Sequence, residues 1–312
     1  MVLDKLPVLS LADDKASFSR AIGDSFKTFG FALVKDFVID RSLIDQAWKL
    51  SEGFFALPLE EKRAYHDPAI GGARGYTPFG VEIAKDAKHH DLKEFWHVGR
   101  DLPPGSPLAD ASMPPNVWPT RPEGFKDVFT ELYRQFDVTG ATILSRIALY
   151  LGLDEHWFDH PIEDGNSVMR LLHYPPLNAA VGEAIRAGAH GDINLITLLL
   201  GAEEAGLELL TREGQWIPAN PPAGALVVNV GDMLERLTNH MLPSTIHRVR
   251  NPDAARARFS RYSMPFFLHL RSDFRFVTLP QCITPDNPDR YPVAITADQF
   301  LQQRLREIGL KK

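Results

Sequence analysis

The sequence predicts a mainly β protein with flanking helices, in which a double-stranded β-helix (jelly-roll) core follows an α/β N-terminal region. Three patterns support this prediction. The first hundred residues alternate between helical and strand-like segments. Residues 125–151 carry the apolar periodicity of one long helix, and short strand-like segments separated by turns fill most of residues 168–270. Repeated short strands of this kind favour a closed or double-layered antiparallel sheet.

The N-terminal region begins with a helix over residues 15–29. Asp13 or Asp14 is placed to cap its first turn, and Gly30 is placed to end it. The amphipathic spacing of the apolar residues between these signals indicates that one face of this helix is buried.

A strand over residues 31–37 and a second amphipathic helix over residues 42–56 follow. The chain then carries seven prolines between Leu102 and Gly124. Prolines lack the backbone N–H that helices and sheets need, so this segment is predicted to be a long loop.

A single long helix is predicted after this loop. Apolar residues recur at three- and four-residue steps from Phe125 to Leu151, Gly140 occupies one position of the stripe, and Gly152 ends the run. We interpret the stripe as core packing.

The second half is predicted to consist of short strands and a closing helix. Thr296 and Gln299 have the spacing of a capping box at the start of that helix, over residues 297–309. The strands are predicted at residues 168–174, 193–200, 206–211, 225–231, 245–250 and 260–270. These elements suggest a division into an N-terminal α/β region with the proline-rich loop, 1–122, and a second part, 123–312, with the long helix, the jelly-roll core and the C-terminal helix.

The composition excludes several functional classes. The chain has 312 residues, 44% of them hydrophobic, and a net charge of -6 at pH 7. Because affinity for nucleic acids depends on excess Lys and Arg, no nucleic-acid partner is expected. The single cysteine, Cys282, has no disulfide partner in the chain and no neighbouring base, so an ordinary packed or surface thiol is expected. No apolar run is long enough to span a bilayer, which predicts a cytoplasmic protein without a membrane partner. The sequence does not determine the oligomeric state.

Two His-x-Asp pairs are candidates for metal binding. Chance alone gives about one or two such pairs in this composition, so their spacing does not distinguish His190-x-Asp192 from His89-x-Asp91. Side chains at i and i+2 of a β-strand point to the same side. His190 and Asp192 lead into an apolar, strand-like run, whereas the other pair lies among lysines that oppose a cation. We therefore favour His190 and Asp192 and expect them to lie on a strand.

A catalytic metal needs a third ligand from another strand. His247 lies in its own strand-like segment and is the preferred candidate, although His173, His240 and His269 are available. Two imidazoles and one carboxylate suit Fe(II), because they leave three adjacent coordination positions open. Zinc is the chief competitor for the same ligands.

Two Arg-x-Ser pairs suggest a binding site for an acid. Arg258-x-Ser260 and Arg261-x-Ser263 are predicted on one strand, and their odd separation places them on opposite faces. The inward arginine would be a costly unpaired charge unless a ligand carboxylate neutralised it.

These motifs occur in a longer series along nearly the whole chain. Near the start are "LPVLSL", "FGFALVKDF", "FFALPLEEK", "GYTPFGVE" and "DLKEFW". Later segments are "RLLHYPP", "AHGDINLITLLL", "GLELL", "STIHRV" and "RYSMPFF". In this order they resemble the isopenicillin N synthase-like branch of the iron- and 2-oxoglutarate-dependent dioxygenases. One departure is Gly191, where many relatives carry threonine.

The resemblance implies the roles of six residues. His190, Asp192 and His247 match the catalytic iron ligands, and Arg261 with Ser263 matches the pair that binds the far carboxylate of 2-oxoglutarate. Tyr174 falls on the Tyr-Pro motif near this co-substrate, although a packed core tyrosine fits it equally well. The implied reaction uses Fe(II), 2-oxoglutarate and O2 to hydroxylate a C–H bond of a small-molecule substrate, with release of succinate and CO2.

Three alternatives stay open at this stage. Some members of the family bind a substrate carboxylate or another anion at the Arg and Ser positions and are iron oxidases that use no 2-oxoglutarate. A second alternative is a catalytically silent protein that binds the metal and 2-oxoglutarate without turnover. A third is a zinc hydrolase on a similar barrel. The main substrate is not encoded in a form that a single sequence reveals.

Overall fold

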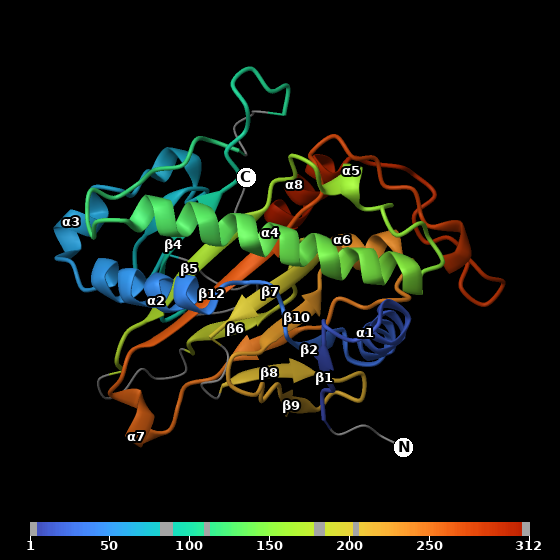
Figure 1. The fold of residues 1–312 in the computed structure, drawn as a ribbon, viewed down its shortest axis with the longest axis horizontal. Helices are drawn as coiled ribbons and strands as arrows, with labels where there is room; N and C mark the ends of the chain where they lie inside the picture. Colours follow the sequence, from blue (N-terminus) through green and yellow to red (C-terminus); the bar gives the residue numbers. More distant parts are fainter. Residues whose placement is uncertain (1–4, 82–89, 109–112, 178–184, 202–205, 308–312) are drawn as a thin grey trace.

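Two β-sheets and the helices that cover them make up the described part of the protein (Figure 1). A computed structural model describes residues 5–81, 90–108, 113–177, 185–201 and 206–307. The larger sheet has eight strands in the order β1-β2-β10-β7-β12-β5-β4-β3, and the smaller has four in the order β6-β11-β8-β9. The strands are β1 Val8–Ser10, β2 Phe31–Lys35, β3 Gly75–Thr77, β4 Glu94–Gly99, β5 Val168–Tyr174, β6 Ala187–His190, β7 Ile196–Leu200, β8 Leu207–Leu210, β9 Trp216–Pro218, β10 Leu226–Val230, β11 His247–Val249 and β12 Arg261–Leu268.

Strands β5 to β12 form the jelly-roll core that the sequence predicts. Four of them, in the order β10-β7-β12-β5, lie at the centre of the larger sheet, and the other four make up the smaller sheet. All pairs within these two groups are antiparallel. Buried apolar side chains of both sheets, including Leu33, Val227, Leu209 and Val249, belong to one cluster and hold the layers together.

The N-terminal region extends the larger sheet at both edges. β2 pairs with β10 and carries the parallel strand β1, while β4 pairs with β5 and carries β3. The larger sheet therefore takes strands from both sides of residue 122. The division at that residue stays a prediction.

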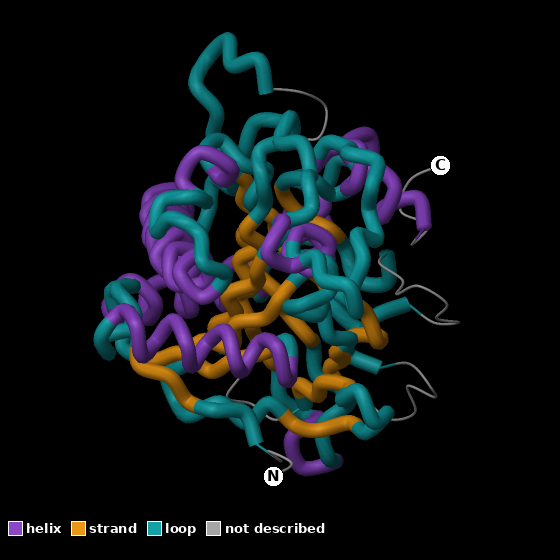
Figure 2. Tube along the Cα trace, turned by 90° about the vertical axis from the view of Figure 1, so that its right-hand side faces the viewer, coloured by secondary structure: helices purple, strands orange, loops and turns teal. Residues whose placement is uncertain are grey.

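The helices are α1 Lys15–Phe29, α2 Arg41–Phe55, α3 Leu59–Arg63, α4 Phe125–Tyr150, α5 Asp159–Ile162, α6 Asp232–Leu237, α7 Ala254–Ala257 and α8 Ala297–Glu307, with short 3-10 turns at Pro68–Ile70 and Pro280–Cys282. Figure 2 shows the long helices along one side of the strands. α4 packs on β4, β7 and β12 of the larger sheet and is itself contacted by α1 and α2. The opposite side of this sheet is left to face the smaller sheet.

Local signals in the sequence set the helix ends. The Asp14 side chain accepts a hydrogen bond from the Ser17 N–H at 3.0 Å, and Gly30 adopts a left-handed conformation with φ 68° after α1. Thr296 and Gln299 form the predicted capping box, with reciprocal bonds of 2.8 and 3.1 Å.

The predicted stripe of α4 is buried against the sheet. Phe136 stacks on Phe266 of β12 with ring centroids 5.3 Å apart, and each such ring contributes about 2 to 3 kcal/mol by leaving water. A Cβ at Gly140 would lie 2.3 Å from Leu268 Cδ1, so glycine is needed where the helix approaches β12 most closely.

The strand predicted at 193–200 was too long. β7 begins at Ile196, and Asp192 lies in the turn between β6 and β7 rather than on a strand. Residues of this turn bond the start of α6: the N–H of Asp232 donates to the Asp192 carbonyl at 2.7 Å, and that of Gly231 to the Leu195 carbonyl at 2.8 Å. The first N–H groups of a helix have no acceptor within the helix, and here carbonyl groups of the turn accept from them in place of water. These hydrogen bonds hold the turn in position.

Other predictions concern loops and the surface. The described residues between 102 and 124 contain no helix or strand, as their prolines predict. Cys282 is a buried free thiol, and burial raises its pKa to about 11, which agrees with a packed, unreactive role.

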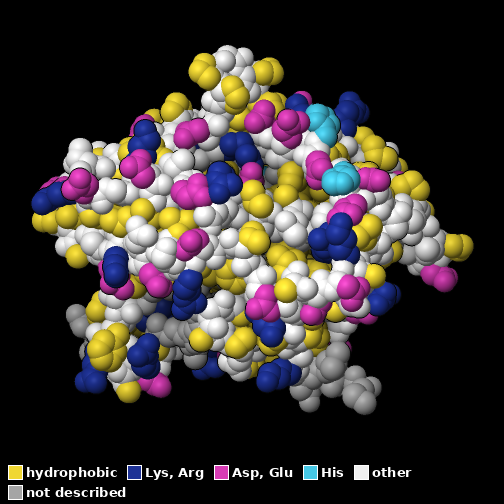
Figure 3. All heavy atoms as spheres, viewed as in Figure 1, with side chains coloured by type: hydrophobic (Ala, Val, Ile, Leu, Met, Phe, Trp, Pro, Cys, Tyr) yellow, Lys and Arg dark blue, Asp and Glu magenta, His cyan; other side chains and the backbone are white. Residues whose placement is uncertain are grey.

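On the face in Figure 3, acidic and basic side chains are interspersed. Among the described helices, none combines the length and apolar character that crossing a bilayer requires.

Gly231→Ala is expected to lower the free energy of unfolding by about 2 kcal/mol, because overpacking a rigid contact costs this much. A Cβ at Gly231 would lie 2.1 Å from the Asn194 carbonyl oxygen, a backbone atom that yields only if the turn moves. Urea denaturation measures the change. Gly53→Ala in α2 is the control, since its Cβ meets nothing closer than 3.5 Å. The control is expected to match wild type or gain up to about 1 kcal/mol, and equal stability of the two variants would contradict the prediction.

Candidate metal centre and acid-binding cavity

His190 and His247 face each other across two neighbouring strands. β6 and β11 are antiparallel, and His190 is the direct register partner of His247. Their ring centroids are 4.4 Å apart. Cross-strand partners lie close together, so the sheet itself brings the two imidazoles together from positions 57 residues apart, counted from the sequence.

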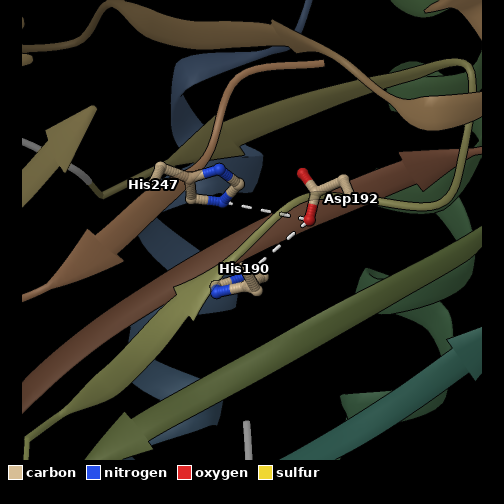
Figure 4. A group of neighbouring side chains, drawn as sticks. All are labelled: His190, Asp192 and His247. Atoms are coloured by element: carbon tan, nitrogen blue, oxygen red, sulfur yellow. Dashed lines mark ion pairs between the residues drawn. The ribbon is translucent and has the colours of Figure 1, made fainter. Parts of the chain in front are cut away.

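Asp192 completes a three-residue cluster. Its Oδ1 lies 3.9 Å from Nε2 of His190 and 3.9 Å from Nε2 of His247, and Figure 4 shows both imidazoles directed toward this oxygen. One donor atom from each residue lies within 4.8 Å of the other two. In the described part of the chain, no other group of three potential metal ligands meets this criterion.

Backbone carbonyls fix the tautomer of each imidazole. Nδ1 of His190 lies 2.7 Å from the Gly188 carbonyl oxygen, and Nδ1 of His247 lies 3.2 Å from that of Thr245. Because a carbonyl only accepts, the proton of each neutral ring is assigned to Nδ1 and the Nε2 lone pair is left for a ligand. Burial, followed by the neighbouring His247, lowers the pKa of His190 to about 4, so this ring is neutral at pH 7.

Two hydrogen bonds orient the second carboxylate oxygen of Asp192, Oδ2. Thr197 donates its hydroxyl to Oδ2 at 2.5 Å, and Asn229 donates its amide at 2.8 Å. Burial raises the pKa of Asp192, but the two imidazoles and these hydrogen bonds together hold it below its usual value. The carboxylate is therefore ionised, and Oδ1 faces the imidazoles.

The donor set fits a divalent transition metal. It offers two imidazole Nε2 atoms and one carboxylate oxygen, and the other polar atom of each side chain is already hydrogen-bonded. Such a set is typical of non-haem Fe(II) sites, in which it leaves positions open for exchangeable ligands.

A cavity that is partly open to solvent lies beside this cluster. Both sheets contribute to its walls, which combine apolar side chains with a few polar and charged ones, as is usual for small-molecule sites. The lining residues are Phe31, Lys93, Arg170, Leu172, Tyr174, Ala187, His190, Asp192, Thr197, Leu199, Leu207, Asn229, His247, Val249, Arg261, Ser263, Pro265 and Phe267.

Arg261 places a buried positive charge in the cavity wall. It is 2% exposed, and none of the acidic side chains in the described residues forms an ion pair with it. Its Nη1 lies 3.5 Å from the Ser263 hydroxyl, its guanidinium carbon lies 5.1 Å from the ring centroid of Tyr174, and its Nε has no hydrogen-bond partner. A buried, uncompensated guanidinium is costly, which makes this wall suitable for a carboxylate ligand.

Comparison with known proteins identifies the family. Residues 6–121 match the family model described as the non-haem dioxygenase in morphine synthesis N-terminal, and residues 165–270 match the 2OG-Fe(II) oxygenase superfamily. The chain belongs to the 2OG-Fe(II) oxygenase superfamily. The resemblance to isopenicillin N synthase-like enzymes noted in the sequence is thereby confirmed.

Individual relatives agree with the family assignment. The chain is 33% identical over 293 residues to a 2-oxoglutarate-Fe(II) type oxidoreductase of Emericella nidulans, which covers 91% of this chain and 83% of that protein. A crystal structure of a 2OG-Fe(II) oxygenase family protein from Caulobacter crescentus is 55% identical, with a TM-score of 0.91 over 97% of this chain and 99% of that one. A full-length Neurospora crassa protein in complex with alpha-KG (2-oxoglutarate) and thymine is 28% identical, with a TM-score of 0.85 over 96% of each chain. The protein is therefore a dioxygenase of this superfamily, whose cofactors are Fe(II), 2-oxoglutarate and O2.

The two Arg-x-Ser pairs do not share a strand, and that prediction was wrong. Arg258 is an exposed residue that follows the short helix α7, and Ser260 precedes β12, which begins at Arg261. The strand periodicity used to separate the pairs therefore applies to Arg261 and Ser263 alone. Both of these point into the cavity, because they are alternate residues of β12.

The other histidines considered as metal ligands lie elsewhere. His173 contacts Glu94 at 2.7 Å and Ser260 at 2.9 Å, outside the cavity. His240 contacts Tyr291. His269 is not among the residues that line the cavity. His89 lies outside the described residues.

Sequence reasoning missed the residues that orient Asp192. Thr197 and Asn229 are single polar residues within apolar strands, and both point to the cavity. The sequence does contain a signal for these two residues. A polar side chain in a buried strand needs a hydrogen-bond partner, so its presence indicates a polar group nearby. Lys93 and Arg170, which also line this oxygenase cavity, carried no comparable signal.

Thr197→Val is expected to raise the dissociation constant for Mn²⁺ by about tenfold, because partners that orient a ligating carboxylate contribute this much to affinity. Isothermal titration of the metal-free protein with Mn²⁺ measures the change. Thr139→Val is the matched control, since the Thr139 hydroxyl bonds only the Gln135 carbonyl within α4. Unchanged Mn²⁺ affinity in a folded Thr197→Val protein would contradict the orienting role.

Proposed function

We propose that this protein hydroxylates an unactivated C–H bond of a small molecule in an Fe(II)- and 2-oxoglutarate-dependent reaction that releases succinate and CO2. One observation carries the proposal. A single cavity contains both a cluster of two imidazoles and a carboxylate and a buried arginine that has no carboxylate partner among the residues that the structure describes. This reaction needs a metal and a dicarboxylic acid side by side, and the cavity offers a fitting wall for each.

His190, Asp192 and His247 are the proposed iron ligands, through Nε2, Oδ1 and Nε2. Fe(II) bound with 2-oxoglutarate supplies the O2-dependent oxidation of the C–H bond. The protein side chains keep the donors in place: the Gly188 and Thr245 carbonyls orient the imidazoles, and Thr197 and Asn229 orient the carboxylate.

Arg261, Ser263 and Tyr174 are proposed to bind 2-oxoglutarate. Arg261 donates to the carboxylate that lies far from the metal, the Ser263 hydroxyl donates to the same group, and Tyr174 packs against the guanidinium. Arginine suits this role, because its planar fork donates two parallel bonds to a carboxylate.

The apolar part of the wall has two proposed roles. Leu172, Leu199, Pro265 and Phe267 line the cavity and restrict water around the reacting groups. The shape of the wall is thereby proposed to orient a small-molecule substrate. We extend this proposal to a cytoplasmic location, which cell fractionation tests.

Incubation of the purified protein with Fe(II), ascorbate and carboxyl-labelled 2-oxoglutarate tests the reaction. A panel of amino acids, nucleobases and phenolic acids serves as substrates, because the similar proteins include a proline hydroxylase and a protein in complex with thymine. The expected result is labelled CO2 in stoichiometry with succinate, lost in His190→Ala and Asp192→Ala proteins that stay folded. Oxygen uptake without succinate would instead indicate an iron oxidase that uses no 2-oxoglutarate. Tight 2-oxoglutarate binding without oxygen uptake would indicate a silent binding protein, and activity restored by zinc would indicate a hydrolase.

Arg261→Leu is expected to raise the KM for 2-oxoglutarate by about 100-fold or more, because a charge-assisted bidentate contact is lost. Arg258→Leu is a control of the same residue type three positions away, on the surface. It is expected to keep the wild-type KM. Uncoupled decarboxylation of 2-oxoglutarate measures both constants, and equal KM values in the two variants would exclude Arg261 as the acid-binding residue.

A further inference from the structure

The strand that carries His190 lies at the edge of the smaller sheet. β6 is the first strand in the order β6-β11-β8-β9, so among the described strands it pairs with β11 alone. β6 has four residues, and its pairing with β11 is irregular between His190 and Ala187. An edge strand this short needs additional contacts to hold a ligand in place, because backbone N–H groups on its outer side lack a neighbouring strand.

Residues 91–93 supply these contacts from the N-terminal region. The Gly188 N–H donates to Oδ1 of Asp91 at 3.0 Å, and the Leu92 N–H donates to the Ile185 carbonyl at 3.2 Å. The same segment leads directly into β4, which belongs to the larger sheet. It therefore joins β6, the edge strand of the smaller sheet, to β4 of the larger sheet.

Asp91 has a defined charge partner in this position. Its Oδ2 lies 2.8 Å from Nζ of Lys93, and the side chains of both are no more than 7% exposed. A buried carboxylate is stable here because Lys93 neutralises it and the Gly188 N–H bonds the other oxygen. Lys93 also lines the cavity beside His190.

A direct path links Asp91 to the proposed metal ligand. The residue whose N–H bonds Asp91, Gly188, is also the residue whose carbonyl accepts from Nδ1 of His190 at 2.7 Å. Only the Gly188 Cα separates these two peptide groups. A displacement of the Gly188 N–H therefore moves the carbonyl that orients the imidazole.

We propose that Asp91 is a positioning residue for His190, acting through the backbone of Gly188, with Lys93 as its neutralising partner. The proposal rests on the proposed function of His190 as a metal ligand. It assigns the N-terminal region a role in metal binding as well as in covering the core. It also gives a role to Asp91 of the His89-x-Asp91 pair. Asp91 is proposed to orient a metal ligand rather than to bind the metal itself.

Two double variants isolate the hydrogen bond. Asp91→Asn/Lys93→Met keeps an oxygen that accepts from Gly188, whereas Asp91→Leu/Lys93→Met has the same charge and nearly the same shape but no acceptor. Removing both members of a buried ion pair avoids leaving an unpaired charge, so both proteins are expected to fold. Thermal unfolding checks this before any other measurement.

Titration with Mn²⁺ under anaerobic conditions is the main readout. We expect the Asp91→Leu/Lys93→Met protein to bind Mn²⁺ about tenfold more weakly than Asp91→Asn/Lys93→Met, the scale found for outer partners of metal ligands. Hydrogen exchange of the Gly188 amide in the metal-free protein is expected to be faster in the leucine variant. A role in stability alone would lower the melting temperature and leave the Mn²⁺ affinity of the folded protein unchanged.

Glu94→Gln is the matched control for stability. Glu94 is close to Asp91 in sequence and forms a buried ion pair with Lys62 at 2.8 Å, and its other hydrogen bonds go to Tyr76 and His173. This variant is expected to unfold at a lower temperature and to bind Mn²⁺ as wild type does. Equal Mn²⁺ affinity in the two double variants overturns the role of Asp91. Wild-type affinity in Asp192→Ala overturns instead the metal site on which the proposed function depends.

Discussion

The approach of one carboxylate oxygen to two imidazoles is the interaction on which the site depends. Oδ1 of Asp192 lies 3.9 Å from Nε2 of both His190 and His247. Two unrelated contacts create this geometry. Sheet register sets the histidines opposite each other, and a turn bonded to the start of α6 brings Asp192 to them. Neither contact is sufficient, because a carboxylate without the histidine pair, or the pair alone, would not hold a catalytic metal.

Lys93 and Asp192 line the cavity as compensated charges, whereas Arg261 does not. Asp91 balances Lys93, and the carboxylate of Asp192 is stabilised by hydrogen bonds and by the neighbouring rings. Arg261 alone of these groups has no acidic side chain within ion-pair distance in the described residues. A protein that buries a guanidinium in this way gains a site that is complete only when an acid is bound. This is the physical basis for linking the cavity to 2-oxoglutarate.

The N-terminal region and the jelly-roll core depend on each other. β2 and β4 extend the larger sheet at its two edges, α4 packs on the outer face, and residues 91–93 bond the edge strand of the smaller sheet. The inner face of the larger sheet is thus free to carry alternating cavity residues, such as Tyr174 on β5 and Arg261 and Ser263 on β12. A sheet that is covered on one side and paired at its edges holds such residues rigidly.

The sequence by itself determined the elements whose signals are local. Helix caps such as Asp14 and Gly30, the α4 stripe and the order of the strands follow from periodicity and turn chemistry, which act over a few residues. The resemblance to a family then indicated His190, Asp192, His247, Arg261 and Ser263. Tertiary structure alone decided that Asp192 lies in a turn, that Arg258 is on the surface, that Thr197 and Asn229 bond the Asp192 carboxylate, and that Asp91 bonds the Gly188 N–H. Those facts depend on hydrogen bonds between segments far apart in the chain, and no local pattern encodes which distant N–H or hydroxyl a carboxylate will meet.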